Sequence, residues 1–475
     1  MSAVSTEASS SGWASKRERL YAHLFAPVDI ASLAIFRICF GAIMFWEVWR
    51  YFAQDRVTRY YVEPELLFKY YGFTWVEPWP GDGMYWHFIL LGVLSLFVMV
   101  GLFYRLSTIL LFPAFTYVFL LDQARYLNHF YLVSLICLLM IFIPAHRALS
   151  IDALIWRNRR SDVAPAWTLW LMRLQLGIVY LYASFAKMNA DWLRNEPPRM
   201  WLAGQTDRTL IWDEGIPIGQ LFTQEWFVQF YTWGGLLFDL LIVPALMWRR
   251  TRALAFAVCL GFHLMNAWVF SIGIFPWFMI CATTLFFEPD WPRKAKLLFA
   301  PFREGDRPHV HPTVVSPLRQ RIIVTLMGIY LAVQLLVPFR HLLYPGIVHW
   351  NEEGHRWSWH MKLRSKDCRG AFFVTDPRSG ATTIVTMDRY LAPHQDKALG
   401  RPDMILQFAH FLRDKWQARG FEQVEVRAKV RCSLNGRPFQ MYVDPHVDLA
   451  AEPRTLGHVD WIVPLRTPLG PEGTE

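Results

Sequence analysis

Long apolar stretches recur along the chain up to about residue 343 and are separated by short polar loops. A helix needs about 20 mostly apolar residues to cross the bilayer core, and each of these stretches reaches or approaches that length. The stretches are Val28–Phe52, Met84–Phe103, Leu106–Leu121, Leu127–Pro144, Trp167–Ala186, Tyr231–Trp248, Ala253–Val269, Ser271–Phe287 and Ile322–His341. The seventh and eighth nearly touch, so one of them could form a re-entrant hairpin. The pattern predicts a mainly α, polytopic membrane bundle of about 8–9 transmembrane helices.

The pattern changes after Leu343, and no later segment is apolar enough to cross a membrane. Short alternating runs separated by turn residues predict strands, and one stretch has helical spacing. The expected elements are a strand over Trp357–Leu363, a hairpin of Phe372–Thr375 with Thr383–Thr386, a helix over Asp403–Ala418, a strand over Val424–Leu434, and a return strand over Phe439–Val443 after the Asn435-Gly436 turn. We therefore expect a C-terminal α+β extramembrane domain over residues 344–475.

We expect no cleavable signal peptide at the N-terminus. Residues 1–15 are small and polar, and basic residues then precede an apolar run that is too long for a signal sequence. The sequence thus divides into an N-terminal tail over 1–25, disordered or amphipathic, a transmembrane domain over 26–343, and the C-terminal domain.

Composition and charge agree with a membrane protein. Hydrophobic residues make up 54% and charged residues only 18%, which excludes a disordered chain. The net charge of +9 is concentrated in alternate loops, where Lys and Arg are more than twice as dense as in the other loops. The positive-inside rule then places the N-terminus inside and the C-terminal domain outside. This distribution also argues against a nucleic-acid binder.

Cysteine and histidine spacing gives no metal motif. The six cysteines form no CxxC pair, and the closest histidine pair, His309 and His311, has no nearby cysteine, so no metal is expected. Cys368 and Cys432 could form a disulfide if their region is extracytoplasmic. The strict alternation around Cys432 favours the alternative, in which it is simply a buried core residue.

Polar residues at membrane depth are costly and are therefore candidates for function. Asn128 and His129 begin one predicted helix, Lys187 ends another, and His263 with Asn266 lie one turn apart near the end of a third. In the predicted topology all of them lie at the outer end.

Each of these residues also has a structural explanation. A helix-end lysine often extends its amine to the membrane surface, and the histidines could serve only in packing. Asp239, in another apolar stretch, could close a polar network or only cap local structure. The functional alternative is that a desolvated Lys187 amine loses its proton readily and acts as a base.

Several motifs, in order along the chain, resemble the vitamin K-dependent gamma-carboxylases and their bacterial homologues with an HTTM domain. They span nearly the whole chain after residue 25. They are Pro27–Arg37, Phe119–Asp122, Leu127–Tyr131, Ala190–Trp192, Phe262–Gly273, Glu288–Lys294, Trp357–Trp359, Asp403–Met404 and Val443–Leu449.

The resemblance implies an enzyme that couples O2-dependent oxidation of vitamin K hydroquinone to its epoxide with carboxylation of glutamate in a protein or peptide. It implies vitamin K hydroquinone (or a related quinol), O2 and CO2 as co-substrates. It also implies a multi-pass protein of the bacterial cytoplasmic membrane. The implied catalytic residues are Lys187, Asn128 and His129, and those implied to position the substrate are His263, Asn266, Asp191, Trp192 and Trp359.

Three departures from the family weaken the carboxylation half of this expectation. The animal enzymes have two adjacent lysines, whereas here Ala186 precedes Lys187, and Asn189 stands where they have an acidic residue. The animal chains are also longer. The alternatives are a quinol epoxidase without carboxylation, or a non-catalytic membrane protein that binds a quinone or lipid.

Overall fold

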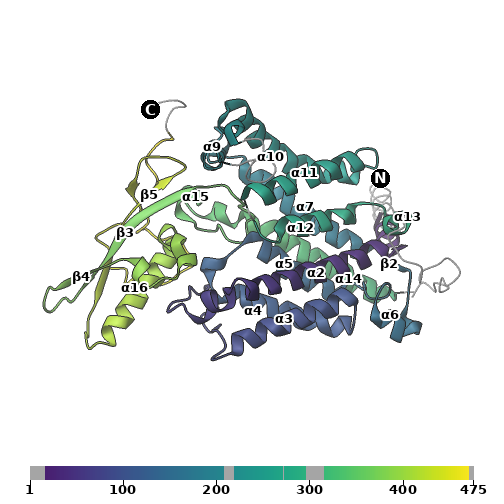
Figure 1. Ribbon diagram of the computed structural model, residues 1–475, viewed down its shortest axis with the longest axis horizontal. Coiled ribbons are helices and arrows are strands. Elements are labelled where there is room, and N and C mark those ends of the chain that lie inside the picture. The colour runs from purple at the N-terminus through teal and green to yellow at the C-terminus, as the bar shows by residue number, and fades with distance from the viewer. Residues whose placement is uncertain (1–15, 208–218, 271, 296–314, 470–475) are drawn as a thin grey trace, which may run out of the picture.

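The computed structural model describes residues 16–207, 219–270, 272–295 and 315–469, which form a long helical bundle with an α+β domain at one end (Figure 1). The long helices lie roughly alongside one another in the bundle. They are α2 (Ala31–Ala53), α3 (Gly83–Val100), α4 (Tyr104–Leu121), α5 (Asn128–Phe142), α7 (Ala166–Lys187), α10 (Glu225–Met247), α11 (Arg252–Phe270), α12 (Phe275–Thr283) and α14 (Pro317–Leu336).

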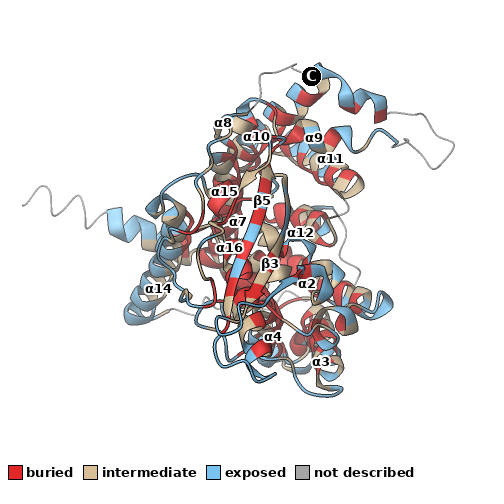
Figure 2. Ribbon diagram, turned by 90° about the vertical axis from the view of Figure 1, so that its left-hand side faces the viewer, coloured by how far each residue is buried: buried red, intermediate tan, exposed pale blue. Residues whose placement is uncertain are grey.

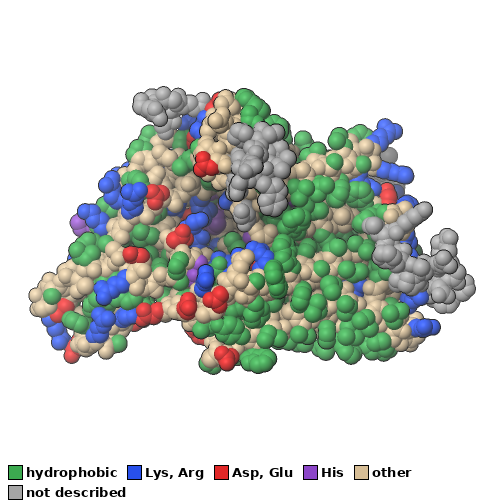
Figure 3. All heavy atoms as spheres, viewed as in Figure 1, with side chains coloured by type: hydrophobic (Ala, Val, Ile, Leu, Met, Phe, Trp, Pro, Cys, Tyr) green, Lys and Arg blue, Asp and Glu red, His purple; other side chains and the backbone are tan. Residues whose placement is uncertain are grey.

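The predicted membrane bundle is confirmed. Among the described residues, seven helices are long and apolar enough to cross a membrane, and the shorter apolar α5 and α12 complete the nine predicted segments. A 3-10 turn extends α12 to Phe286, and another extends α14 to Leu343. Apolar side chains cover much of the visible face over α2, α3 and α4, whereas charged side chains gather over the α+β domain (Figure 3).

Short elements lie in the connections between the long helices. Residues 16–25 are helical, while the disorder predicted for 1–15 lies outside the described residues. The short elements are β1 (Pro27–Asp29), α6 (Ile151–Ile155), β2 (Val163–Pro165), α8 (Ala190–Leu193), α9 (Pro198–Ala203), α13 (Trp291–Lys294) and α15 (Val348–Asn351).

The C-terminal domain is an antiparallel sheet with the order β4-β3-β5-β6, and α16 packs on it. Its elements are β3 (Lys366–Thr375), β4 (Thr382–Val385), α16 (Pro402–Gln417), β5 (Glu425–Leu434) and β6 (Gln440–Met441). Along β5 every second residue from Val426 to Leu434 is buried, and Figure 2 shows this alternation. The predicted hairpin, helix and alternating strand are therefore confirmed.

One predicted strand is wrong, because residues Trp357–Leu363 form turns rather than extended backbone. Trp357, Trp359 and Lys362 have φ values of 61°, 57° and 50°, in the left-handed region that bulky residues rarely adopt. Such a backbone cannot pair as a strand. We call residues 357–362 the crossing segment, since it runs from the C-terminal domain to the end of the bundle.

The structure joins Cys368 and Cys432 in a disulfide. The two residues face each other directly across β3 and β5, and Cys432 is fully buried. Cys432 is therefore buried, as the alternation predicted, but the favoured alternative of a simple core residue is wrong, because the paired strands bring the two cysteines together in a bond.

The bundle and the C-terminal domain are tied together by buried polar contacts. The Asp122 carboxylate accepts hydrogen bonds from the Phe68 N–H in the bundle and from the Gln395 amide in the C-terminal domain. Arg437 donates two hydrogen bonds of 2.6 Å to Asp191, which follows α7. The domain is thereby held against the end of the bundle where α7 terminates.

Candidate active site

Lys187 lies at the last residue of α7, and its amine forms an ion pair with the carboxylate of Asp239 in α10. Both residues are buried, with 8% and 6% of their surface exposed. The amine also lies 5.4 Å from the centre of the Trp192 ring. A buried charge is unfavourable unless it is paired, so Asp239 explains how a lysine is tolerated here.

A cavity of about 90 Å³ adjoins this pair. His263 and Asn266 reach it from α11, one turn apart, and both are buried. The His263 Nε2 atom lies 3.0 Å from the Tyr180 hydroxyl, which fixes the orientation of the ring. The structure therefore brings Lys187, His263 and Asn266 together around one cavity. The sequence predicts all three residues at the same end of the bundle.

The C-terminal region completes the cavity. Met361 and Lys362 of the crossing segment line it together with Trp192 and Trp201. The Trp192 indole N–H donates a hydrogen bond to the backbone carbonyl of Thr232, 3.1 Å away, so its ring is fixed beside Lys187. Backbone strain often collects at functional sites. The backbone of Lys362 has a φ of 50°, in the left-handed region, which is consistent with that tendency.

Other residues expected at the site do not line this cavity. Asn128 donates to the backbone carbonyl of His360 at 3.1 Å and thus binds the crossing segment to α5. The centre of the His129 ring lies 5.5 Å from that of the Phe275 ring. Phe275 lines the cavity and so separates His129 from it. Asn128 and His129 therefore lie behind the wall of the cavity.

Asp191 and Trp359 also lie outside the cavity. Asp191 is occupied by Arg437 and by the Asn435 amide, which donates at 2.7 Å. Burial alone would raise the pKa of Asp191, but these hydrogen bonds and the Arg437 charge hold it below its usual value. Trp359 is almost fully buried against Tyr131, with ring centres 4.9 Å apart.

The sequence-based prediction misses two residues of this cavity. The sequence leaves open whether Asp239 closes a polar network or only caps local structure, although an acidic residue in an apolar stretch signals a partner. Lys362 lies in a segment that the sequence predicts to be a strand, and its own position gives no signal of a site. Only the fold shows that these residues share a cavity with Lys187.

A second cavity of about 340 Å³ lies at the other end of the crossing segment. Three guanidinium groups line it, together with aromatic and acidic residues. The guanidinium groups belong to Arg340, Arg356 and Arg401, and the aromatic and acidic residues include Tyr70, Trp357 and Glu352. Such a pocket can bind an anionic group, because guanidinium groups pair well with carboxylates.

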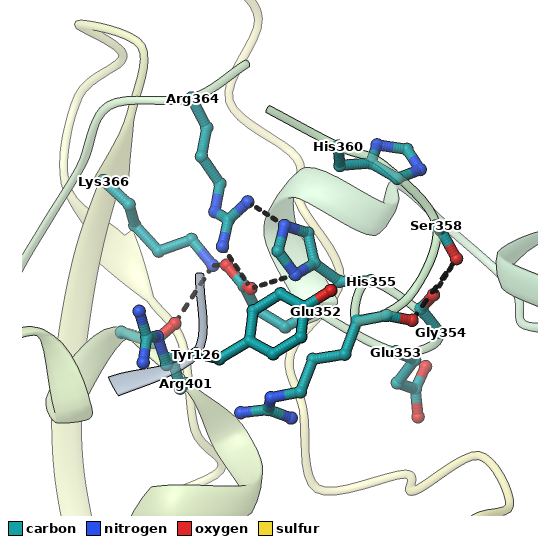
Figure 4. A network of polar contacts seen from close by, with 12 residues as sticks. Tyr126, Glu352, Glu353, Gly354, His355, Ser358, His360, Arg364, Lys366 and Arg401 are labelled. Carbon is teal, nitrogen blue, oxygen red and sulfur yellow. Dashed lines mark hydrogen bonds and ion pairs between the residues drawn. The ribbon is translucent and has the colours of Figure 1, made fainter. Parts of the chain in front are cut away.

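The wall of this second cavity is a buried charge network, shown in Figure 4. Glu352 accepts from Arg364 at 2.6 Å and from Lys366 at 2.8 Å. Burial would raise the pKa of Glu352, but these two cations hold it below its usual value. His355 contacts Arg364, and its ring lies 5.7 Å from that of His360. The network fixes the backbone on either side of the crossing segment.

No group of three or more His, Cys, Asp or Glu side chains within the described ranges is arranged to hold a metal ion. His309 and His311 lie outside those ranges.

The fold and the site define a polytopic membrane protein with a buried polar centre under a docked extramembrane domain. The HTTM domain family matches residues 25–291, and the lumenal domain of vitamin K-dependent gamma-carboxylase matches residues 319–468. The chain therefore belongs to the vitamin K-dependent gamma-carboxylase family. No solved structure matches it.

Proposed function

We propose that the protein oxidises vitamin K hydroquinone, or a related quinol, with O2 to the epoxide and uses this reaction to carboxylate glutamate in a protein or peptide. The observation that carries the proposal is the buried Lys187 amine in a cavity that also contains His263 and Asn266. Membership of the gamma-carboxylase family supports the reaction type.

Lys187 is the proposed base that removes a proton from a hydroxyl of the quinol. The Lys187–Asp239 pair has no net charge whether the proton is on the amine or on the carboxyl group. The form with the proton on Asp239 leaves a free amine beside the cavity. The free amine takes the quinol proton, and the positive charge that results lies beside Trp192 and Asp239.

His263 and Asn266 are proposed to position the quinol. His263 is already held by Tyr180, and Asn266 faces the same cavity one turn away. Both can bind a quinol oxygen, and neither requires a metal to do so. When bound, the quinol supplies reducing equivalents to O2 and, through its oxygenated form, the strong base needed to deprotonate the γ-carbon of glutamate.

The pocket lined by arginines is the proposed site for the glutamate substrate. Its three guanidinium groups suit a carboxylate, and the crossing segment links it to the quinol cavity. In the carboxylation, a C–H bond of the γ-carbon breaks and a C–C bond to CO2 forms. The quinol is oxidised to its epoxide and O2 is reduced, with water as the second product.

The test uses purified protein with vitamin K hydroquinone, O2, labelled bicarbonate and a glutamate-containing peptide. We expect epoxide by mass spectrometry and label in the peptide. Lys187→Ala should lower epoxide formation about 10²–10⁴-fold, the usual effect of losing a general base. Lys187→Arg should not restore it, because arginine stays protonated.

The same assay separates the alternatives. Epoxide without labelled peptide indicates a quinol epoxidase that does not carboxylate glutamate. A well-folded Lys187→Ala protein that forms epoxide at the wild-type rate contradicts the catalytic role of the lysine. Wild-type protein that binds the quinol and forms no epoxide is a quinone-binding protein.

A further inference from the structure

A pocket of about 200 Å³ lies at the end of the bundle opposite the C-terminal domain, beside α6 (Figure 1). The turn from α3 to α4, the loop after α5, and α6 with the turn that follows it contribute its lining. The polar lining residues are Arg105, Arg147, Arg159, His146 and Asp152. None of them lines the cavity beside Lys187 or the second cavity at the crossing segment.

The positive charge of this lining is in excess. Three arginines face one aspartate there, which leaves a net charge of +2 with the histidine neutral. The Asp152 carboxylate accepts hydrogen bonds from the backbone N–H groups of Phe103 and Tyr104, at 2.8 and 2.9 Å. Within the described part of the chain, none of the three arginines forms an ion pair. The pocket therefore offers cationic groups that the protein itself does not neutralise.

His146 adds an unsatisfied polar atom to the same pocket. Its ring stacks on that of Tyr104 with ring centres 4.9 Å apart, and its Nδ1 atom is buried without a hydrogen-bond partner among the described residues. Burial and the charges of Arg105 and Arg147 lower the pKa of His146 to about 3, so the ring is neutral at pH 7. Leaving a buried polar atom unpaired is costly, and a ligand in the pocket can supply the missing hydrogen bond.

The surroundings of the pocket are apolar. Phe103 and Leu106 line it and are exposed, and so are Leu154 and Ile155, which follow the lining residue Ala153. Helices α3 and α4 are both long and apolar enough to cross a membrane, so the turn between them lies at the membrane surface. An anionic group bound to the arginines could therefore carry hydrocarbon chains that lie over these apolar side chains.

We propose that this pocket binds the phosphate group of an anionic phospholipid. Guanidinium groups match phosphate oxygens in geometry and form charge-assisted hydrogen bonds with them. A free phosphate ion has the same chemistry, but it makes no use of the exposed apolar residues around the pocket, so these residues favour the lipid. The site does not rest on the proposed function, because it lies at the other end of the bundle from Lys187.

Basic residues at one membrane surface do not by themselves make a site. Figure 3 shows Lys and Arg side chains at this end of the bundle, as the positive-inside rule predicts. The pocket differs from this general charge in two ways. Its arginines converge on one concave space, and its histidine has a buried atom without a partner in the described chain.

The test measures the binding of phosphatidylglycerol to the purified full chain in a neutral detergent, by native mass spectrometry, with phosphatidylcholine as the uncharged lipid. Arg147→Gln and Arg159→Gln each remove one charge from the pocket. The Arg147 side chain has no hydrogen bond or ion pair within the described ranges, so this variant should fold. The matched control is Arg250→Gln, which removes an exposed arginine between α10 and α11, outside the pocket.

We expect phosphatidylglycerol to bind at least about tenfold more tightly than phosphatidylcholine, and each pocket variant to weaken it about fivefold, as expected for one basic residue near an anionic lipid. Arg250→Gln should stay within about twofold of wild type, because solvent and salt screen an exposed distant charge. Equal losses in all three variants would assign the binding to general charge and overturn the pocket. Equal affinities of the wild type for the two lipids would also overturn it.

A second measurement separates the lipid from free phosphate. Thermal unfolding is followed with short-chain phosphatidylglycerol and, separately, with inorganic phosphate at the same concentration. We expect the lipid to raise the midpoint of wild type and of Arg250→Gln but not that of Arg147→Gln, whose midpoint without lipid should equal that of wild type. Inorganic phosphate should give no shift. An equal shift with phosphate would assign the pocket to a soluble phosphate and overturn the lipid proposal.

Discussion

At the scale of single residues, the main feature is the buried pair of Lys187 and Asp239. Breaking a buried ion pair leaves one uncompensated charge, whereas replacing both partners with apolar residues is often neutral for stability. Asp239→Leu alone should therefore lower the free energy of unfolding by about 3–5 kcal/mol. The double variant Lys187→Met, Asp239→Leu should regain most of that loss.

These variants are compared by denaturant titration in mixed micelles and by epoxide assay. The control, Glu65→Gln, breaks the exposed pair with Lys415 and should cost no more than about 1 kcal/mol. A double variant as stable as wild type should still form no epoxide. Wild-type turnover in that variant would mean that the pair serves only stability.

A second prediction at this scale concerns pH. Burial, with the charge of Arg364 adding to it, lowers the pKa of His349 to about 3, well below its ordinary value of 6.5. Between these two values the unfolded chain binds a proton that the folded chain does not, so the folded state loses stability as the pH falls from about 6.5 toward 3.

Thermal unfolding at pH 7.5 and at pH 5.5 measures this loss. We expect a lower midpoint at pH 5.5, and a smaller difference in His349→Gln. His446, which is exposed, provides the control, and His446→Gln should keep the wild-type difference. If His349→Gln has the full wild-type pH dependence, another group is responsible.

At the scale of elements, the turn after β5 fastens the C-terminal domain to the bundle. Asn435 and Gly436 have φ values of 52° and 78°, and the Asn435 side chain binds both Asp191 and the backbone N–H of Ser365. Positive φ strains a β-branched residue. Gly436→Val should therefore destabilise the fold by about 1–3 kcal/mol.

The midpoint of thermal unfolding measures this cost. Thr383→Val is the matched control, since it places valine at an exposed position of β4 without changing the backbone demand. An unchanged midpoint in Gly436→Val would show that the turn does not contribute to stability as described.

At the scale of the whole molecule, the Cys368–Cys432 disulfide bears on topology. Disulfides persist in oxidising compartments, so the bond agrees with a C-terminal domain outside the cytoplasm. In intact cells, we expect a cysteine placed at Gly380 to react with an impermeant reagent and one placed at Arg159 not to react. Labelling of both from the same side would contradict the predicted topology.

The disulfide also gives a stability prediction. It closes a loop of 64 residues, and a native disulfide typically contributes about 2–4 kcal/mol. The double variant Cys368→Ser, Cys432→Ser should lower the unfolding midpoint. The control is Cys39→Ser, because Cys39 is a free and only partly buried cysteine. Cys137 is buried, so Cys137→Ser is unsuitable as a control. Equal midpoints for the double variant and wild type would show that the bond does not form.

The sequence by itself determined the features that depend on local periodicity. Long apolar runs gave the helices of the bundle, helical spacing gave α16, and alternation gave β5. The costly polar residues at membrane depth also identified Lys187, His263 and Asn266, which the fold brings to one cavity. These features follow from burial, which leaves a regular pattern in the chain.

Only the tertiary structure decided which distant residues meet. Lys187 and Asp239 are 52 positions apart, and nothing in their local sequence pairs them. The crossing segment reads as a strand because its apolar residues alternate, yet its contacts with both domains hold three residues at positive φ. Pairing and backbone strain depend on contacts between separate elements, and such contacts have no local period in the sequence.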